Sequence, residues 1–405
     1  MFLFFNINLI KLHYYKKSIL PYQKLHKMYE LILDICRPSD WHHHFREGKD
    51  WLQTTVRPCF EQFHYAVAMP NLTTPIRTYL YALEYYRQIR DEIPQEFSSA
   101  EPCMTYYLSP GLSTQDIIDA SADLEHRVIG VKYYPQGATT NSSYGVSDYR
   151  QVREQLRSID GTMLKLMIHS EDPTYPDIFT REQRFLTDPD VGQLRPIMEE
   201  FGALPITLEH ISSSAAAQVL SDDWQITKSG RLAATITPHH LKYTTSDIFG
   251  AGTGMGCAGI GIRPHMFCCP ILKSKDDLDA LHELAVGGHS NIFLGTDCAP
   301  HTDAIKHRLG RPGVFNIHSA LSDVVEVFAN ANHLDRLEGF ISLNGCSWYN
   351  KPAPLHLRTR IYSVSNQDDR PMVPKVVFVG NDPNMRVTPM RPGARLPYSV
   401  EAVNN

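Results

Sequence analysis

Two apolar runs with a histidine at or next to their last residue, LKLMIH (Leu164–His169) and ITLEHI (Ile206–Ile211), decide the fold. Each has the length of a β-strand, and between them lies a helix-like stretch, Thr187–Phe201. A strand, a helix and a second strand at this spacing form a right-handed βαβ unit. The two runs are therefore predicted to be parallel strands of one sheet, with a histidine at the carboxyl end of each.

The same alternation continues along the chain from Met28. Six further runs complete a set of eight strands: Leu31–Ile35, Tyr65–Met69, Met104–Leu108, Val128–Tyr133, Leu232–Thr237 and Asn291–Gly295. Other helix-like stretches lie between strands: Ile76–Arg90, Ser113–Glu125, Ser147–Arg157 and Lys275–Val286. Eight such units predict a closed (β/α)8 barrel of the TIM type. No G-x-G-x-x-G motif follows an early strand, which disfavours a dinucleotide-binding sheet.

The barrel is predicted to span residues 28–350, followed by a C-terminal extension, 351–405, packed on it. That extension is rich in proline and has two short β-like runs, Val376–Val379 among them. Residues 1–27 are basic, contain no acid and open with an apolar run too short to span a membrane. We predict an N-terminal extension outside the fold; a weak targeting or anchoring segment is the alternative.

The amino-acid composition limits the functions that the chain could have. The 405 residues are 42% hydrophobic and 20% charged, with a formal net charge of −5 and no block dense in lysine and arginine, so nucleic acid is a poor candidate partner. Eight cysteines without a C-x-x-C pair fit a reducing compartment. The glycine-rich Gly250–Gly261 contains no lysine and no G-K-[ST] ending, which predicts a flexible loop and not a phosphate-binding one.

Histidine is the unusual residue, at 19 copies, and several histidines fall at strand ends. His42 and His44 are two residues apart and project to one face of an extended chain, a spacing that suits zinc. A chance histidine run on a loop is the alternative, and a shift of register would make His43 the ligand instead. His169 and His210 each end an apolar run; either could be a packed histidine, but their repetition on successive strands favours metal ligation.

Two other polar residues end strands. Lys132 lies in the apolar run VIGVKYYP, where its amine either reaches the barrel rim or is desolvated. A desolvated, neutral amine could react with carbon dioxide to give a carbamate that bridges two metal ions. Asp297 ends the eighth run and could cap the next helix, or bind a metal and accept a proton from water.

Eight segments, read in order, resemble the dihydroorotases, in the compact class that forms homodimers within the amidohydrolase superfamily. They are DWHHHFREG, AMPNLTTP, KYYPQGATTNSSYGV, MIHSE, LEHIS, RLAATITPHHL, CCPILK and LGTDCAPH. The similarity covers roughly Tyr29 to Tyr349. K-x-Y-P followed by A-T-T-N-S-S, together with M-P-N-L, is more specific to this family than the motifs shared across the superfamily.

The resemblance implies a reversible, zinc-dependent cyclisation of N-carbamoyl-L-aspartate to L-dihydroorotate and water, the third step of pyrimidine synthesis, in the cytoplasm. It implies two zinc ions per chain, bridged by carboxylated Lys132. The ligands that it implies are His42, His44, Lys132, His169, His210 and Asp297. Asp297 is also the implied catalytic residue, since a carboxylate there can both accept and return a proton.

The resemblance further implies the substrate contacts Arg46, Asn71, Cys269, His301 and Pro312. A lid, Pro135–Gly145, carries Thr139 and Thr140 at its tip. The implied partners are a small anionic substrate and a second copy of the chain, with neither nucleic acid nor membrane.

Two alternative functions are weaker. Another cyclic-amide hydrolase, such as a hydantoinase or allantoinase, does not explain Arg46 with Asn71, nor the A-T-T-N-S-S lid. A non-catalytic scaffold would have lost metal ligands, and none is lost.

Overall fold

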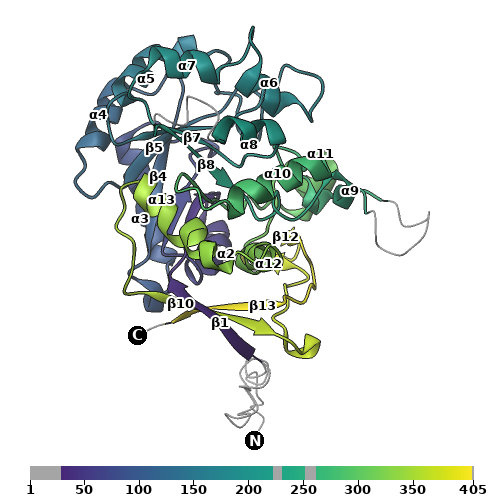
Figure 1. Ribbon diagram of the computed structural model, residues 1–405. Coiled ribbons are helices and arrows are strands. Elements are labelled where there is room, and N and C mark those ends of the chain that lie inside the picture. The colour runs from purple at the N-terminus through teal and green to yellow at the C-terminus, as the bar shows by residue number, and fades with distance from the viewer. Residues whose placement is uncertain (1–28, 222–229, 251–260, 404–405) are drawn as a thin grey trace, which may run out of the picture.

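The computed structural model describes residues 29–221, 230–250 and 261–403. Eight parallel strands form one sheet in chain order, with helices packed around it (Figure 1). The strands are β2 (Asp40–His43), β3 (Tyr65–Ala68), β4 (Glu101–Tyr107), β5 (Val128–Tyr133), β6 (Lys165–Ile168), β7 (Ile206–Leu208), β8 (Leu232–Ile236) and β9 (Ile292–Leu294). The predicted (β/α)8 barrel is confirmed.

Helices follow the strands. The described helices are α2 (Lys49–Phe60), α3 (Tyr79–Glu92), α4 (Thr114–Ala122), α5 (Arg153–Ile159), α6 (Arg181–Thr187), α7 (Leu194–Glu200), α8 (Ser214–Leu220), α9 (Thr245–Ile248), α10 (Lys275–Val286), α11 (Asp303–Leu309), α12 (Ala320–Asn330) and α13 (Asn344–Trp348). The bounds of α10 are those predicted from the sequence. Its first residue is fixed locally, because Ser274 and Asp277 form a capping box.

The first predicted strand, Leu31–Ile35, forms but lies outside the barrel. It belongs to β1 (Tyr29–Cys36), which pairs antiparallel with β10 (Arg358–Val364), and β10 pairs with β13 (Tyr398–Val403). β1 is half exposed, as an antiparallel strand with one solvated face can be. The first barrel strand is the four-residue DWHH of β2, which is too short and too polar to stand out as an apolar run.

The predicted helix Thr187–Phe201 is also wrong as a single element. α6 ends at Thr187 and α7 starts at Leu194. Between them the Asp188 carboxylate accepts the backbone N–H groups of Asp190 and Val191, at 2.9 and 3.1 Å. A local side-chain-to-backbone turn of this kind competes with helix formation and breaks the stretch in two.

The C-terminal segment packs beside the barrel. Figure 1 shows β1, β10 and β13 together below α2 and α12, and β13 contacts α12. The predicted run Val376–Val379 contains β11 (Val377–Phe378), which pairs with β12 (Arg386–Val387). The predicted extension, residues 1–27, and most of the glycine-rich stretch, 251–260, lie outside the described residues.

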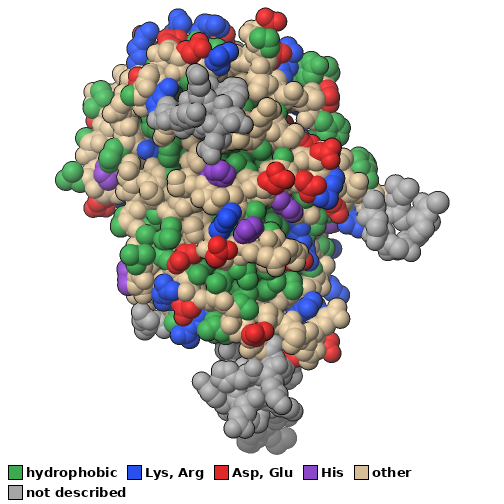
Figure 2. Space-filling model, in the orientation of Figure 1, with side chains coloured by type: hydrophobic (Ala, Val, Ile, Leu, Met, Phe, Trp, Pro, Cys, Tyr) green, Lys and Arg blue, Asp and Glu red, His purple; other side chains and the backbone are tan. Residues whose placement is uncertain are grey.

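The molecular surface mixes charges of both signs. Figure 2 shows acidic and basic side chains interspersed over the face in view. Among the described residues, none of the helices has the length and apolar character needed to cross a membrane.

The barrel closes through side chains as well as backbone. The Asp40 carboxylate at the start of β2 accepts the N–H and the hydroxyl of Thr296, just after β9, at 2.7 and 2.6 Å. Backbone bonds continue the seam, from Asp297 N–H to the His42 carbonyl at 2.8 Å and from His44 N–H to the Cys298 carbonyl at 3.0 Å. The first and last strands are thereby joined next to the strand ends that carry His42 and Asp297.

An apolar cluster fills the barrel below that seam. Trp41 is fully buried and stacks on Tyr349 at 4.8 Å between ring centroids, with Tyr65 and Phe293 also against it. Trp41 and Tyr65 stand near the amino ends of their strands, so this cluster closes the barrel at the end away from the histidines.

Two truncations should separate the N-terminal segment from the folded part. Deleting residues 1–27 leaves every described residue that pairs with β10 in place, so the melting temperature should equal that of the full chain. Deleting residues 1–36 removes β1 and exposes the edge of β10, so the melting temperature should fall. Differential scanning calorimetry of both proteins checks this, and a clear loss of stability in the shorter truncation would show that residues 1–27 contribute to the fold.

Candidate metal and substrate site

The carboxyl ends of the barrel strands bring the predicted metal ligands into one chamber. His42 lies on β2 and Lys132 on β5, His169 directly follows β6, and His210 lies two residues after β7. Asp297 lies three residues after β9. All are nine-tenths or more buried. Parallel strands of a barrel end at one face, so these ends converge although they are far apart in the chain.

One group consists of His42, His44 and Asp297. The Asp297 carboxylate oxygen Oδ1 lies 3.5 Å from His42 Nε2 and 3.2 Å from His44 Nε2. Two ligands of a tetrahedral zinc ion lie about 3.4 Å apart, given Zn–N distances near 2.1 Å. The spacing of these three atoms fits one such ion.

A second group consists of His169 and His210. Their facing nitrogens, His169 Nδ1 and His210 Nε2, are 3.2 Å apart, again the spacing of two ligands on one ion. The ring centroids of His210 and His42 are 4.9 Å apart, so the two groups adjoin.

Lys132 lies near both groups, since its amine interacts electrostatically with Asp297 and with His169 and His210. Its side chain is fully buried, and its Nζ has no hydrogen-bond partner among the described residues. Burial lowers its pKa to about 8, against the opposing charges of Glu209 and Asp297. The amine is buried and does not reach the solvated rim, so that alternative is wrong, and the lowered pKa makes its neutral, reactive form more accessible than in an ordinary lysine.

The histidine rings are held by carboxylates on their far sides. His42 Nδ1 lies 2.6 Å from Glu209 Oε2, which also accepts the Thr235 hydroxyl at 2.8 Å. His169 Nε2 lies 2.8 Å from Glu171 Oε2. A carboxylate that accepts the second N–H of a histidine fixes its tautomer and orients its free nitrogen toward a metal.

The electrostatics of the chamber favour neutral histidine and ionised carboxylate. Burial lowers the pKa of His44 to about 3, against the Asp297 charge that would raise it. Burial alone would raise the pKa of Asp297, but the hydrogen bond from His44 holds it well below its ordinary value. These are the protonation states that bind a divalent cation.

The backbone is strained where these side chains leave their strands. Arg46, His210 and Asp297 have positive φ values of 68°, 40° and 45°, which non-glycine residues rarely adopt. At Gly295 a Cβ atom would lie 2.8 Å from the His42 Cβ and 2.9 Å from the Thr235 Cβ. Only glycine lets β9 approach His42 this closely.

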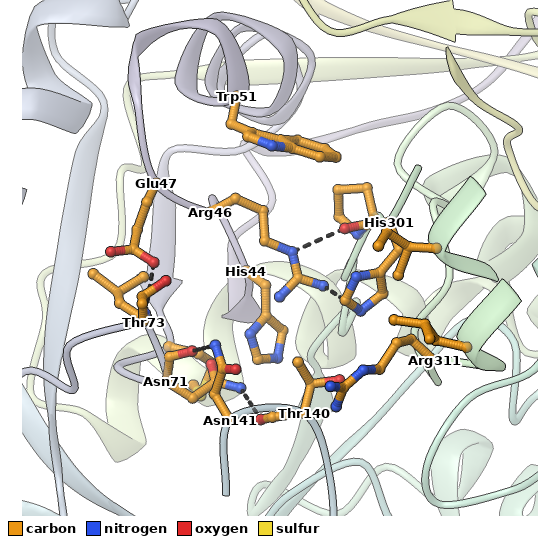
Figure 3. Close-up of a pocket in the computed structure, with 15 residues that line it drawn as sticks. His44, Arg46, Glu47, Trp51, Asn71, Thr73, Thr140, Asn141, His301 and Arg311 are labelled. Carbon is orange, nitrogen blue, oxygen red and sulfur yellow. Dashed lines mark hydrogen bonds between the residues drawn. The ribbon is translucent and has the colours of Figure 1, made fainter. Parts of the chain in front are cut away.

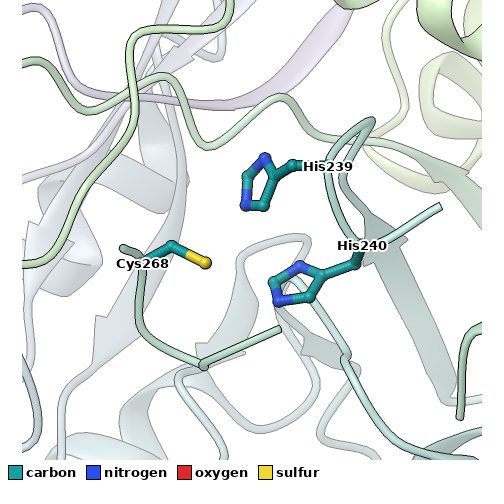
Figure 4. A group of neighbouring side chains, drawn as sticks. All are labelled: His239, His240 and Cys268. Carbon is teal, nitrogen blue, oxygen red and sulfur yellow. The ribbon is translucent and has the colours of Figure 1, made fainter. Parts of the chain in front are cut away.

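Other histidines near the chamber are engaged elsewhere. His43 bonds Asp40 through Nδ1 at 2.8 Å and packs against Phe45, so the alternative in which it replaces His42 or His44 is wrong. His239, His240 and Cys268 also lie together (Figure 4). Both ring nitrogens of His240 are taken, by the Thr237 hydroxyl and the Pro270 carbonyl, which argues against a further metal site.

The predicted substrate and lid residues surround the same chamber. Its lining includes Arg46, Asn71, Thr139, Thr140, Cys269 and Pro312. The lid is closed over it, because the Asn71 amide donates to the Thr140 carbonyl at 3.0 Å and the Asn141 amide donates to the Asn71 carbonyl at 2.9 Å. The chamber has a volume of only ≈ 20 Å³, room for about one water molecule. A ring-sized molecule enters only if the lid moves.

An outer cavity of ≈ 360 Å³ leads to this chamber and shares His44, Arg46, Asn71 and Thr140 with it (Figure 3). Arg46 donates to the Pro300 carbonyl at 2.9 Å and, through Nη2, faces His301 Nε2 at 3.2 Å. His301 therefore lies beside Arg46 in the outer cavity and not in the inner chamber. Thr302, not Asp297, caps α11, so the capping alternative for Asp297 is wrong.

The sequence analysis missed Glu209, Glu171 and Asp40. Glu209 immediately precedes His210, and Glu171 follows His169 by two residues, so adjacency to a candidate ligand was the available signal. The partner of each carboxylate in space was not readable from the chain.

Comparison with known proteins finds relatives of the whole barrel. No protein-family profile matches the chain. The chain is 38% identical over 322 residues to a dihydroorotase of Coxiella burnetii, covering 79% of this chain and 86% of that protein. The crystal structure of a dihydroorotase from Saccharomyces cerevisiae in complex with 5-fluoroorotic acid matches with a TM-score of 0.78 at 27% identity, covering 92% of this chain and 100% of that one. An L-hydantoinase from Arthrobacter aurescens shares the fold, with a TM-score of 0.66 at 14% identity over 91% of this chain and 82% of that one.

Replacing Glu209 tests whether it orients His42. Glu209→Gln keeps the shape but removes the charge that holds the His42 N–H, so metal affinity should fall about 10–100-fold. Competition with a chelator measures this. Glu199→Gln, at a highly exposed ion pair with Arg195, is the matched control and should leave affinity unchanged. Equal metal affinities in the two variants would show that Glu209 does not support metal binding.

Proposed function

Because the chain belongs to the dihydroorotase family, we propose that it works with two zinc ions per chain, bridged by carboxylated Lys132. It is a hydrolase of a cyclic amide that interconverts L-dihydroorotate and N-carbamoyl-L-aspartate in pyrimidine biosynthesis. Dihydroorotases depend on metal, and the described residues include groups able to hold it.

One observation carries the proposal of two bridged ions. Two sets of ligand atoms at tetrahedral spacing adjoin each other, and near both lies the buried Lys132, whose amine has no hydrogen-bond partner among the described residues. Carboxylation would turn that amine into an anion whose oxygens could serve as metal ligands. His42, His44 and Asp297 would hold one ion, and His169 and His210 the other.

The substrate is an anion, and Arg46 is placed to bind its carboxylate. Two of its N–H groups are used by the Pro300 carbonyl and His301, which fixes the guanidinium where the outer cavity meets the chamber. Burial lowers the pKa of His301 to about 2, so His301 stays neutral and accepts from Arg46. Asn71 would exchange its bond to the lid for one to the same carboxylate.

Asp297 is the proposed proton carrier. Bound zinc would polarise the scissile carbonyl and activate a water molecule. As the new C–O bond forms and the ring C–N bond breaks, Asp297 takes the water proton and gives it to the leaving nitrogen. Ring closure runs the same steps in reverse and consumes one proton overall, so equilibrium favours closure at acidic pH and hydrolysis at alkaline pH.

The lid completes the site. Thr140 Oγ1 is buried without a partner among the described residues, and Thr139 lines the same chamber. We assign both to hydrogen bonds with bound substrate, with Cys269 and Pro312 as backbone contacts to its ring. Closure then excludes bulk water from the reaction.

We further propose that the enzyme is a cytoplasmic homodimer, in line with the class that it resembles. The seven described cysteines are all free thiols, as in a reducing compartment. A hydantoinase is the second candidate on fold alone, but Arg46 beside His301 provides a carboxylate site that a hydantoin ring does not need.

Metal analysis tests the bridged pair of ions. The wild type should contain about two zinc ions per chain, as two tetrahedral ligand sets require, and should hydrolyse L-dihydroorotate. Lys132→Ala should lose zinc and turnover, with partial recovery on addition of a small carboxylic acid that replaces the carbamate. Full activity with a single bound metal, or wild-type zinc content in Lys132→Ala, would contradict the bridge.

Substitutions of Asp297 and of Arg46 should affect different kinetic constants. Asp297→Asn can still offer an oxygen to the metal but cannot accept a proton, so kcat should fall by at least ~10²–10⁴ at matched zinc content. Arg46→Ala should mainly raise KM and leave zinc in place. Steady-state kinetics beside zinc analysis checks both. A near-wild-type kcat in Asp297→Asn would show that Asp297 binds metal but does not carry the proton.

A further inference from the structure

Two hydroxyl groups that line the inner chamber are buried and have no hydrogen-bond partner among the described residues: Thr140 Oγ1 and Tyr134 Oη. The proposed function gives Thr140 a role in the closed lid. It gives Tyr134 none. A buried hydroxyl without a hydrogen-bond partner costs free energy. Such a hydroxyl in a reaction chamber indicates that a bound ligand provides its partner.

Tyr134 is firmly placed. It directly follows β5, two residues after Lys132, so both side chains fall on the same face of the extended chain. Its carbonyl accepts the Val146 N–H at 2.9 Å, which ties the two ends of the lid together. Its ring packs against Tyr107, 5.1 Å between centroids, and is only 1% exposed. The hydroxyl thus has little freedom to find another partner.

The ring also lies among the proposed metal ligands. Lys132 Nζ is 5.1 Å from its centroid, and the His169 ring is 6.5 Å away. Tyr134 lines the inner chamber with the proposed metal ligands and not the outer cavity, whereas Arg46 and Asn71 line both and His301 lines the outer cavity. A substrate whose carboxylate is held by those three residues would present its reacting carbonyl, and not its carboxylate, to Tyr134.

We propose that Tyr134 is a further catalytic residue, whose hydroxyl donates a hydrogen bond to the oxygen of the scissile amide carbonyl. This inference rests on the proposed function, which supplies the substrate and its orientation. The carbonyl oxygen gains negative charge as water adds to its carbon, and a preorganised neutral donor stabilises that charge without reorganising. A phenol, with an ordinary pKa near 10, keeps its proton at neutral pH and returns to the same state after each turnover.

Tyr134→Phe removes this one atom. Loss of a donor to a developing oxyanion should lower kcat about 10²–10³-fold. KM for L-dihydroorotate should change by less than about threefold, because the bond strengthens chiefly in the transition state. Zinc content should match the wild type. The melting temperature should be equal or higher, because the deleted hydroxyl has no protein partner, whereas a structural hydroxyl would lower it when lost.

Tyr133→Phe is the matched control. Tyr133 is equally buried and next in sequence, but its ring packs against Phe185 of α6 on the outer side of the barrel, 6.0 Å between centroids. The same deletion there should leave kcat at the wild-type value.

Three results would overturn the inference: wild-type kcat in Tyr134→Phe, equal losses of kcat in the two variants, or a loss that added zinc restores. The last would show that Tyr134 supports the ligands and does not touch substrate. Failure of the proposed function is visible separately, as missing zinc or missing turnover in the wild type, and it would remove this inference with it.

Discussion

The site depends on how the two ends of an eight-stranded sheet are joined. The Asp40 carboxylate accepts four donors: the backbone N–H and hydroxyl of Thr296, the backbone N–H of His42, and His43 Nδ1. A buried carboxylate with every lone pair used is stable only in this arrangement, so β2 and β9 have one register. That register places His42 and His44 beside Asp297, which no contact within either strand could do. His43, absent from the metal site, contributes by securing the same carboxylate.

The barrel core and the site differ in backbone strain and in how completely their buried polar groups are hydrogen-bonded. Below the strand ends, Trp41 and its aromatic neighbours pack without unmet polar groups other than the indole nitrogen. Above them, Arg46, His210 and Asp297 have strained backbones, and Lys132 and Tyr134 hold buried polar atoms without partners. Each of these features costs folding free energy, although a bound ligand could pair the buried polar atoms. The well-packed barrel supplies the stability that offsets this cost. Strain and unmet polar groups of this kind are typical of sites that bind and react.

Much of the fold was predictable because it rests on local periodicity. Seven of the eight barrel strands were identified from apolar runs of strand length, and α10 from its amphipathic pattern. The errors share a cause. β2 is four residues long and owes its place to Asp40, while Leu31–Ile35 has the pattern of a strand but pairs with β10 more than 300 residues away. The break between α6 and α7 was hidden because Asp188 acts through its own backbone neighbours and leaves the apolar pattern intact.

The sequence by itself determined which chemical groups stand at strand ends and that these ends lie on one face of the molecule, because parallel strands joined by helices admit no other arrangement. It could not say which histidine faces inward, since a shift of one residue exchanges the two faces of a strand. Only the tertiary structure decided this, by binding His43 to Asp40 and leaving His42 and His44 toward Asp297. It also supplied Glu209 and Glu171 behind the rings, the closed lid and the unpartnered Tyr134 hydroxyl. Whether the contact joins near neighbours, as with Glu171 and His169, or distant residues, as with Glu209 and His42, the direction of each side chain is set by the packing of the whole barrel.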